Sequence, residues 1–296
     1  MLDPDRDLVI HGDNLEVLPT LPDGAFTVVY LDPPFNTGRA QRRVGLRTVR
    51  SAAGTRIGFG GHTYEQTRDR LRSYDDSFDD YWAFLTPRLE QVWRVLAEDG
   101  TLYLHLDYRE VHYAKVCLDG LFGRECFLNE IIWAYDYGAR AKNRWPTKHD
   151  NILVYVKDPD RYHFDAAEVD REPYMAPGLV TPEKAALGKL PTDVWWHTIV
   201  SPTGKEKTGY PTQKPMGIVR RMIAASSRPG DRVADFFAGS GTVGAVARDL
   251  GRRYLLVDSH PDAIATMRTR LGTPTLDRDP PEFRTLPHPP NPVASG

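Results

Sequence analysis

The alternation of apolar and polar positions predicts a regular succession of strands and helices over most of the chain. Short apolar runs rich in β-branched and aromatic residues predict strands at 8–10, 25–31, 101–106, 131–135, 152–156, 232–236 and 254–257. Apolar residues at helical spacing predict helices at 77–96, 216–227, 242–250 and 261–271, and Pro87 is expected to kink or split the first of them. This succession is typical of an α/β fold built on a doubly wound sheet.

Three stretches show neither the helical nor the strand period of apolar residues. Residues 37–77 are rich in glycine and hold nine arginines between Arg39 and Arg72, and we expect an inserted loop or a small helical excursion there. Residues 158–208 have few periodic apolar positions, which predicts a variable surface lobe, and residues 272–296 form a proline-rich tail without a core pattern. We therefore expect a single domain over 1–271 that carries the insertion and the lobe and is followed by the tail.

Composition and charge limit the class of protein and the cellular compartment that the sequence predicts. The 296 residues carry a formal net charge of -2, so any basic surface for nucleic acid must be local. Cys117 and Cys126 have neither the spacing of a metal site nor that of a disulfide framework. The first ten residues lack an apolar signal core, and no apolar stretch approaches the roughly 18 residues of a membrane span. We expect a cytoplasmic protein with free thiols, no membrane contact and no metal.

A glycine-rich turn follows the strand predicted at 232–236. Gly239, Gly241 and Gly244 have the spacing G-x-G-x-x-G, and Asp258 ends the next strand. Glycines let a ligand approach the backbone, the helix start favours polar or anionic groups, and the acidic side chain is placed to accept two ribose hydroxyls. The spacing alone does not separate a dinucleotide from S-adenosyl-L-methionine, and a turn of packing glycines without a ligand stays open. Only about fifty residues follow Gly244, too few to complete a dinucleotide-binding sheet in its usual chain order, which favours S-adenosyl-L-methionine.

The strand predicted at 25–31 ends in Asp32-Pro33-Pro34-Phe35, at a position where open α/β sheets place ligand sites. The two prolines fix two φ angles and have no backbone N–H, so their backbone offers hydrogen-bond acceptors and no donors. The Asp32 carboxylate and the Pro33 carbonyl can each take one N–H of an exocyclic amine, whose lone pair is otherwise delocalised into its ring. Phe35 can stack on the base. The structural alternative is a Pro-Pro strand terminator with Asp32 as a turn cap.

With Thr212-Gln213-Lys214-Pro215 before the glycine turn, these motifs resemble the beta-class amino-group DNA methyltransferases, in which the catalytic half precedes the cofactor half. The resemblance implies a Rossmann-like sheet that uses S-adenosyl-L-methionine, and it assigns the target amine to Asp32, Pro33, Pro34 and Phe35. It also implies which residues bind the cofactor. Asp13 is implied near its adenine, and Thr212, Gln213 and Lys214 near its carboxylate. The rest of the cofactor is expected to contact Asp235, Phe237, Ala238, Gly239, Ser240, Gly241, Thr242 and Asp258. The resemblance covers about 8–36, 78–156 and 195–271 and departs at Phe35, where the family often has tyrosine.

The residues present narrow the choice of methylated base. Methylation at cytosine carbon 5 needs a cysteine nucleophile that usually follows proline, whereas Cys117 follows Val116 and Cys126 follows Glu125. Adenine N6 and cytosine N4 remain, and within the family a leading Asp favours adenine whereas many cytosine enzymes carry Ser. We expect an adenine enzyme that flips its target out of duplex DNA, with an N4-cytosine enzyme as the first alternative. A catalytically idle DNA-recognition subunit and a nicotinamide-dependent dehydrogenase are further alternatives, the latter without a role for Asp32.

Two basic segments are candidates for DNA contact: Arg39, Arg42, Arg43 and Arg47 after the Asp-Pro-Pro-Phe corner, and Arg140, Lys142 and Arg144 in the loop 135–149. Phosphate contacts beside a flipped base need such groups; the alternatives are a solvated charged face and, in the second segment, an inward-packed Trp145. Segment 158–208 is the candidate target-recognition lobe. The resemblance implies double-stranded DNA as the partner, and a cognate restriction endonuclease and a homodimer are further candidates. His105 is expected in the core or beside the site, not as a catalytic base.

Overall fold

The structure of the chain, a computed structural model, describes residues 6–37, 41–50, 56–57, 63–74, 78, 80–136, 140–201, 203–274 and 279–286. The chain forms two compact units, one spanning Asn36–Asp79 and the other made of Met1–Phe35 and Asp80–Gly296. The larger unit contains every strand and helix that the apolar pattern predicts.

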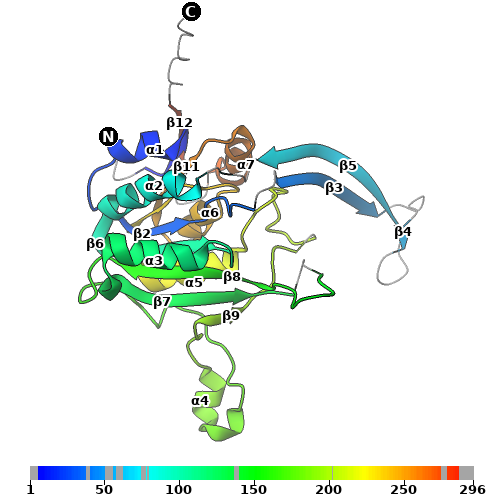
Figure 1. Cartoon of the computed structure of the whole chain (residues 1–296). Coiled ribbons are helices and arrows are strands. Elements are labelled where there is room, and N and C mark those ends of the chain that lie inside the picture. Colours follow the sequence, from blue (N-terminus) through cyan, green and yellow to red (C-terminus); the bar gives the residue numbers. More distant parts are fainter. Residues whose placement is uncertain are drawn as a thin grey trace, which may run out of the picture. The chain divides into compact units, whose positions relative to one another are not determined.

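A nine-stranded mixed sheet forms the centre of the larger unit (Figure 1). Its strands are β1 (Leu8–His11), β2 (Phe26–Leu31), β6 (Leu96–Leu106), β7 (Phe127–Ala134), β8 (His149–Val156), β9 (Val194–Trp196), β10 (Arg232–Asp235), β11 (Arg253–Asp258) and β12 (Glu282–Thr285). Their order is β12-β1-β11-β10-β2-β6-β8-β7-β9. The first six strands are parallel, β8 is antiparallel to both of its neighbours, and β9 is parallel to β7.

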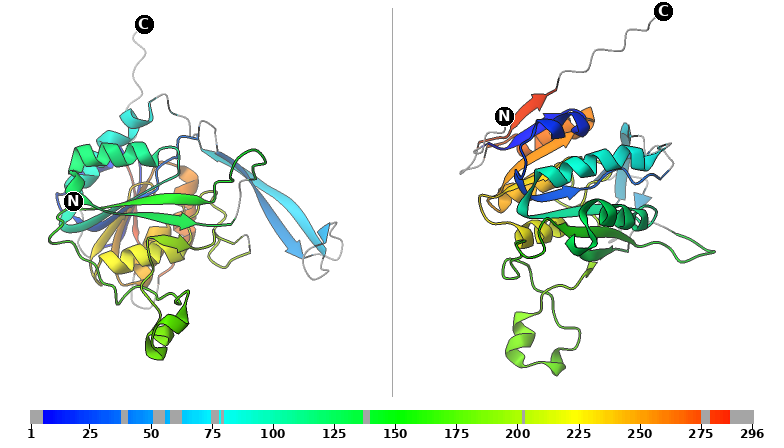
Figure 2. Two further views of the ribbon diagram at one scale, coloured as in Figure 1. Left: turned by 60° about the horizontal axis from the view of Figure 1, so that its bottom comes forward. Right: turned by 60° about the vertical axis from the view of Figure 1, so that its left-hand side comes forward.

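Helices cover both faces of this sheet (Figure 2). The α-helices of the larger unit are α1 (Asn14–Val17), α2 (Tyr81–Val95), α3 (Val111–Phe122), α4 (Pro182–Leu187), α5 (Met216–Ser226), α6 (Thr242–Asp249) and α7 (Pro261–Leu271). Short 3₁₀ turns lie at Leu18–Thr20, Arg124–Cys126 and Pro177–Leu179. Pro87 lies inside α2, which continues through it. The helix α5 packs with α6 and α7 on one face, and α2 and α3 lie on the other.

Alternating side chains of the strands build the two apolar layers. On β2, Val28 and Tyr30 join the cluster formed with α5, α6 and α7, whereas the intervening Val29 points to the opposite face. The helix α5 contributes Ile218 and Met222, which are both almost fully buried. Because every central strand is covered on both faces, its sequence is a continuous apolar run, which explains why these strands could be predicted.

The strand order places a topological switch point between β2 and β10. From β2 the chain continues through α2 to β6 on one side, and from β10 it continues through α6 to β11 on the other. The two strands pair in parallel, with Asp235 opposite Tyr30. Open α/β sheets bind ligands at the carboxyl ends of strands at such a point. The segment of β2 also precedes that of β10 in the chain, which confirms the predicted doubly wound fold and its permuted order.

The smaller unit differs from the expectation for residues 37–77. Its described residues form an antiparallel sheet of β3 (Gln41–Arg50), β5 (Thr63–Tyr74) and β4 (Arg56–Ile57), in the order β3-β5-β4. The predicted loop or helical excursion is therefore wrong for these residues. Backbone pairing in a strand ribbon needs no apolar alternation, so the search for a buried face missed it.

The tail also departs from the sequence-based expectation. Residues 282–285 form β12, which pairs in parallel with β1, and the amide of Glu282 donates to the carbonyl of Asp7 over 2.9 Å. Phe283 packs against the apolar cluster. The pairing was not predicted, because four residues that add one strand to an edge are too few to show an apolar period. In the described part of the chain, no helix combines the length and the apolarity that crossing a membrane requires.

Candidate active site

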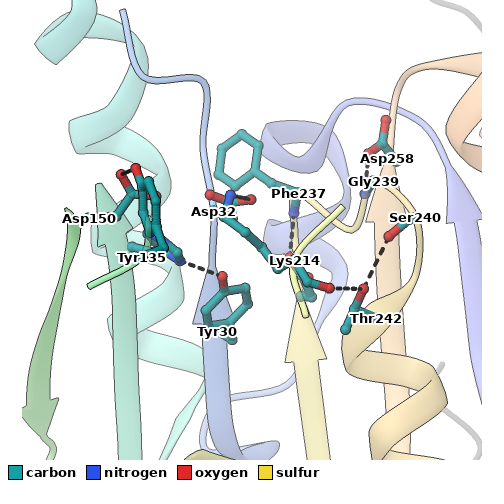
Figure 3. Close-up of polar contacts among 12 residues, drawn as sticks. Tyr30, Asp32, Tyr135, Asp150, Lys214, Phe237, Gly239, Ser240, Thr242 and Asp258 are labelled. Atoms are coloured by element: carbon teal, nitrogen blue, oxygen red, sulfur yellow. Dashed lines mark hydrogen bonds and ion pairs between the residues drawn. The ribbon is translucent and has the colours of Figure 1, made fainter. Parts of the chain in front are cut away.

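The candidate site lies at the switch point, where Asp32 follows β2. The Nζ of Lys214 donates to Oδ2 of Asp32, and the two side chains are only 12% and 14% exposed, respectively (Figure 3). The second carboxylate oxygen, Oδ1, is buried and has no hydrogen-bond partner among the described residues. A buried oxygen without a donor is costly unless a ligand supplies one. This corner therefore offers one paired and one unpaired acceptor.

The rest of the Asp-Pro-Pro-Phe corner surrounds that carboxylate. Pro33 is buried and Phe35 is half-buried. The Phe35 ring centroid lies 5.8 Å from that of His105 and 5.0 Å from Nζ of Lys214. Because neither proline has an N–H, the backbone of Pro33 and Pro34 presents carbonyls only. The arrangement suits a ligand that donates hydrogen bonds and has a flat ring.

The glycine-rich turn joins β10 to α6 beside this corner. Gly239 and Gly241 have φ values of 49° and 73°, which favour glycine. A Cβ on Gly239 would lie 3.1 Å from the ring of Tyr210, and one on Gly241 would lie 2.7 Å from Met267. No side chain caps the first turn of α6. The start of this helix therefore offers amide donors to a polar ligand.

Buried carboxylates hold the turn in place. Asp258 accepts the amide of Gly239 on Oδ2 and that of His260 on Oδ1, each over 2.8 Å. Burial raises the pKa of Asp258, and these two hydrogen bonds oppose the rise. Asp235 accepts the amide of Phe237 over 2.9 Å. Burial, reinforced by the charges of Asp32 and Asp258, raises its pKa well above the usual carboxyl value.

The loop after β1 contributes the predicted Asp13 to the same edge. Its Oδ1 accepts the amide of Leu15 over 2.8 Å and Nη2 of Arg88 over 2.9 Å. The neighbouring Asn14 donates from Nδ2 to the carbonyl of Phe236 over 2.7 Å, which ties this loop to the end of β10. Sequence reasoning did not identify Arg88. A charged residue within the apolar stripe of α2 is the signal that points to it.

The residues of segment 212–214 make two kinds of contact, one within their own loop and one with Asp32. Oε1 of Gln213 accepts from Thr208, and its Nε2 donates to the carbonyl of Glu206 over 2.7 Å, so this amide closes its own loop. Thr212 is exposed. The ammonium of Lys214 contacts Asp32, and the carbonyl of Lys214 accepts from Oγ1 of Thr242 over 3.2 Å. Ser240 and Thr242 share a hydrogen bond over 3.1 Å at the start of α6.

A buried polar chain that the sequence did not reveal lies behind Phe35. The hydroxyl of Tyr30 lies 2.7 Å from Nδ1 of His105, whose Nε2 lies 3.3 Å from Oδ2 of Asp150. Tyr135 donates to Oδ1 of Asp150 over 3.0 Å. Burial alone would raise the pKa of Asp150, but His105, Lys214 and Tyr135 hold it below its usual value. His105 is fully buried, as expected.

The candidate DNA-contact residues lie on different segments. Arg140, Lys142 and Arg144 are exposed in the loop between β7 and β8, at the carboxyl edge of the sheet. Trp145 in this loop is 94% exposed, so the inward packing considered for it is wrong. Arg42, Arg43 and Arg47 lie on β3 of the smaller unit, and Arg39 lies outside the described residues.

An acidic Pro-Pro-aromatic corner beside a glycine-rich turn, both at the switch point of a doubly wound sheet, defines a Rossmann-like methyltransferase. The DNA methylase family N6_N4_Mtase matches residues 26–268, and the chain belongs to this family of DNA methyltransferases. The DNA adenine methyltransferase YhdJ of Escherichia coli (strain K12) is 30% identical over 89% of this chain and 82% of its own length. The type II methyltransferase M.HpaI of Haemophilus parainfluenzae is 28% identical over 90% of this chain and 74% of its own length.

Solved structures share the fold at low sequence identity. The PvuII DNA methyltransferase (cytosine-N4-specific) has a TM-score of 0.62 and 15% identity, and the match covers 88% of this chain and 85% of that one. The M1.HpyAVI–SAM complex has a TM-score of 0.57 and 19% identity, with 90% and 99% covered. TTHA0409 of Thermus thermophilus, a putative DNA modification methylase complexed with S-adenosyl-L-methionine, has a TM-score of 0.54 and 21% identity, with 89% and 94% covered.

Proposed function

We propose that this DNA methyltransferase transfers a methyl group from S-adenosyl-L-methionine to the exocyclic N6 amine of an adenine that is flipped out of duplex DNA. The observation that carries the proposal is the carboxylate of Asp32, which ends β2 beside the glycine-rich turn with its Oδ1 buried and unpaired among the described residues. An exocyclic amine is a ligand that donates hydrogen bonds and brings a flat ring, which suits this corner.

The residues around the glycine-rich turn fit the cofactor. S-adenosyl-L-methionine, when bound, supplies a methyl group on a positively charged sulfur. The uncapped start of α6 presents amides to a carboxylate, and the positive φ of Gly239 shapes the turn before it. Asp258 fixes this turn and presents its carboxylate to ribose hydroxyls. The proposed cofactor site is completed by Asp13, Thr212, Gln213, Asp235, Phe237, Ala238, Ser240, Gly241 and Thr242.

The catalytic corner acts on the target amine. Oδ1 of Asp32 and the carbonyl of Pro33 each accept one N–H, which draws the nitrogen lone pair out of the ring and toward the methyl group. Phe35 stacks on the base, and Pro34 holds the corner rigid. No covalent enzyme intermediate is needed, which agrees with the lack of a cysteine in this corner.

Adenine is favoured over cytosine by two observations. The leading residue of the corner is Asp32, and the relative with 30% identity is named a DNA adenine methyltransferase. An N4-cytosine enzyme is the second candidate, because the PvuII enzyme shares the fold and is named cytosine-N4-specific. The intact Asp32 and glycine turn argue against an idle recognition subunit.

Double-stranded DNA is the proposed partner. Arg39, Arg42, Arg43 and Arg47, together with Arg140, Lys142 and Arg144, are proposed to bind phosphates, and residues 158–208 to read the target sequence. A cognate restriction endonuclease is a further proposed partner, because M.HpaI is named a type II methyltransferase. We place the enzyme in the cytoplasm, where it meets DNA; a homodimer is a further proposal.

The proposal is tested by the identity of the modified nucleoside. The protein is produced in cells without their own DNA methyltransferases, and the DNA is digested to nucleosides and analysed by mass spectrometry against DNA from cells with an empty vector. The proposal predicts N6-methyl-2′-deoxyadenosine. N4-methyl-2′-deoxycytidine would establish the cytosine alternative, and the absence of both would support an idle subunit.

A further inference from the structure

The ammonium of Lys214 contacts two members of the catalytic corner at once. Its Nζ donates to Oδ2 of Asp32 and lies 5.0 Å from the ring centroid of Phe35, a distance typical of a cation–π contact. Both ionised groups are largely buried, with exposed fractions of 12% for Lys214 and 14% for Asp32. A charge pair with so little solvent is oriented much more strictly than one at the surface.

The backbone that carries this ammonium is held on both sides. The carbonyl of Lys214 accepts the hydroxyl of Thr242 over 3.2 Å, which ties it to the start of α6. Pro215 follows directly and precedes α5, and a residue before proline has a restricted backbone. The lysine side chain therefore reaches Asp32 from a fixed position between two helix starts.

The contact makes the two oxygens of Asp32 inequivalent. Oδ2 is paired with Lys214, whereas Oδ1 is buried without a partner among the described residues. Rotation of the carboxylate about its Cβ–Cγ bond by a quarter turn would break the pair and turn the free oxygen out of its position. As long as Lys214 stays paired with Oδ2, Oδ1 of Asp32 faces a single direction.

Lys214 also balances the acidic surroundings of the corner. Its charge lowers the pKa of Asp150 and opposes the rise in the pKa of Asp235, so it acts on three carboxyl groups from different strands. Removal of one partner of a buried pair leaves the other charge uncompensated.

We propose that Lys214 is a positioning residue of the catalytic carboxylate: it holds Oδ2 of Asp32 so that Oδ1 faces and accepts the N–H of the target amine. This inference rests on the proposed function and differs from the expectation that Lys214 contacts the cofactor carboxylate. The two roles separate experimentally, because the first acts on the rate of methyl transfer and the second on cofactor affinity.

The test compares Lys214→Met with Lys214→Arg and the wild-type protein. Single-turnover methylation is measured at saturating duplex DNA and S-adenosyl-L-methionine, and cofactor affinity is measured by calorimetry without DNA. We expect Lys214→Met to slow methyl transfer by about 100-fold, the scale on which removal of a preorganised electrostatic group acts, with the cofactor Kd within about twofold of wild type. Lys214→Arg keeps the charge and is expected to recover part of the rate. Thermal unfolding verifies that each variant is folded.

Lys115→Met is the matched control. Lys115 also pairs with a half-buried aspartate, Asp119, over 2.7 Å, but on α3, where Asp119 contacts the distant end of β8 through Tyr155. The methyl-transfer rate and the cofactor affinity of Lys115→Met are expected to match those of the wild-type protein.

Three outcomes would overturn the inference: a normal rate for Lys214→Met at saturating cofactor, a cofactor Kd weakened by about tenfold or more, or no recovery in Lys214→Arg. If the wild-type protein methylates no DNA, the proposed function fails. The calorimetric result still decides between the two roles of Lys214 in that case, because a weakened cofactor Kd contradicts a positioning role.

Discussion

Tyr30, two residues before Asp32 of the proposed catalytic corner, places its hydroxyl oxygen 2.7 Å from Nδ1 of His105. Burial, reinforced by three nearby aspartates, raises the pKa of Tyr30 well above its usual value, so this hydroxyl keeps its proton. Nε2 of His105 lies 3.3 Å from Oδ2 of Asp150. These two contacts join β2 to β6 and β8 through buried side chains.

Loss of His105 is expected to destabilise the fold. His105→Leu removes the imidazole that contacts both the buried carboxylate of Asp150 and the hydroxyl of Tyr30. We expect the free energy of unfolding at pH 7 to fall by about 3 kcal/mol, measured by urea titration. Tyr30→Phe is the milder variant, because it removes a neutral hydrogen bond and is expected to cost about 1 kcal/mol.

The effect of His105→Leu should depend on pH in a defined direction. The pKa of Asp150 is lowered in the folded state, so its ionised form stabilises the protein above the ordinary carboxyl value of about 3.9, and this contribution is lost as pH falls through the lowered pKa. The difference in the free energy of unfolding between wild type and His105→Leu should therefore shrink below about pH 4. A difference that stays constant from pH 3 to pH 7 would show that Asp150 does not depend on His105.

Asp235 is expected to show the opposite dependence. Its pKa is raised by burial and by the charges of Asp32 and Asp258, so the folded protein binds a proton more tightly than the unfolded chain. Stability contributed by that proton is present below about pH 3.9 and is lost as pH rises through the raised pKa, at about 1.4 kcal/mol for each tenfold difference in proton affinity. Asp235→Asn keeps the acceptor for Phe237 without a charge.

Urea titration of the cofactor-free protein between pH 4 and pH 7 checks this prediction. Asp235→Asn should lose less stability than wild type as the pH rises. Asp231→Asn is the control, because Asp231 lies before β10 at the opposite edge of the sheet and is more exposed. Parallel curves for Asp235→Asn and wild type would contradict the role of burial at this carboxyl group.

Asp32 and Asp258 could be predicted from the sequence because each lies at the end of a short, mostly apolar run, whereas Asp235 was assigned through the family resemblance. Parallel strands that are covered on both faces produce such runs, and their carboxyl ends meet at one edge. Asp32, Asp235 and Asp258 follow or end β2, β10 and β11, which are adjacent strands of the sheet. Local patterns were sufficient for Asp32 and Asp258.

The partners of those residues could not be predicted, because they depend on register and on contacts between distant segments. Lys214 is 182 residues from Asp32, and the pairing of His105 with Asp150 follows from the antiparallel register of β6 and β8. The strands β3 and β12 were missed for another reason. Their pairing relies on backbone hydrogen bonds, which leave no apolar period in a short or polar strand.

The arginines of β3 provide a test of DNA binding. If Arg42, Arg43 and Arg47 neutralise phosphates, their replacement by Ala should weaken binding to all duplexes alike and reduce the salt slope by about one for each phosphate that is no longer neutralised. Titration of labelled DNA at several salt concentrations measures both effects. Cofactor affinity should not change.

A variant with the same change in net charge separates phosphate binding from a general charge effect. Arg6, Arg124 and Arg228 are exposed and precede β1, β7 and β10, at the edge of the sheet opposite the site. Their joint replacement by Ala should leave the salt slope close to wild type. Equal slopes in the two triple variants would assign the β3 arginines to a solvated surface.

The carboxylate of Asp32 is the centre of this account, and Asp32→Asn tests it most directly. The change keeps the shape of the side chain and removes its charge, so the amine N–H loses its strongest acceptor. Single-turnover transfer of labelled methyl groups to duplex DNA is measured together with calorimetric binding of S-adenosyl-L-methionine, with Asp119→Asn as the control. We expect methyl transfer to fall by about 100-fold or more with unchanged cofactor affinity and a normal rate in the control. A near-normal rate of methyl transfer in Asp32→Asn would contradict the mechanism.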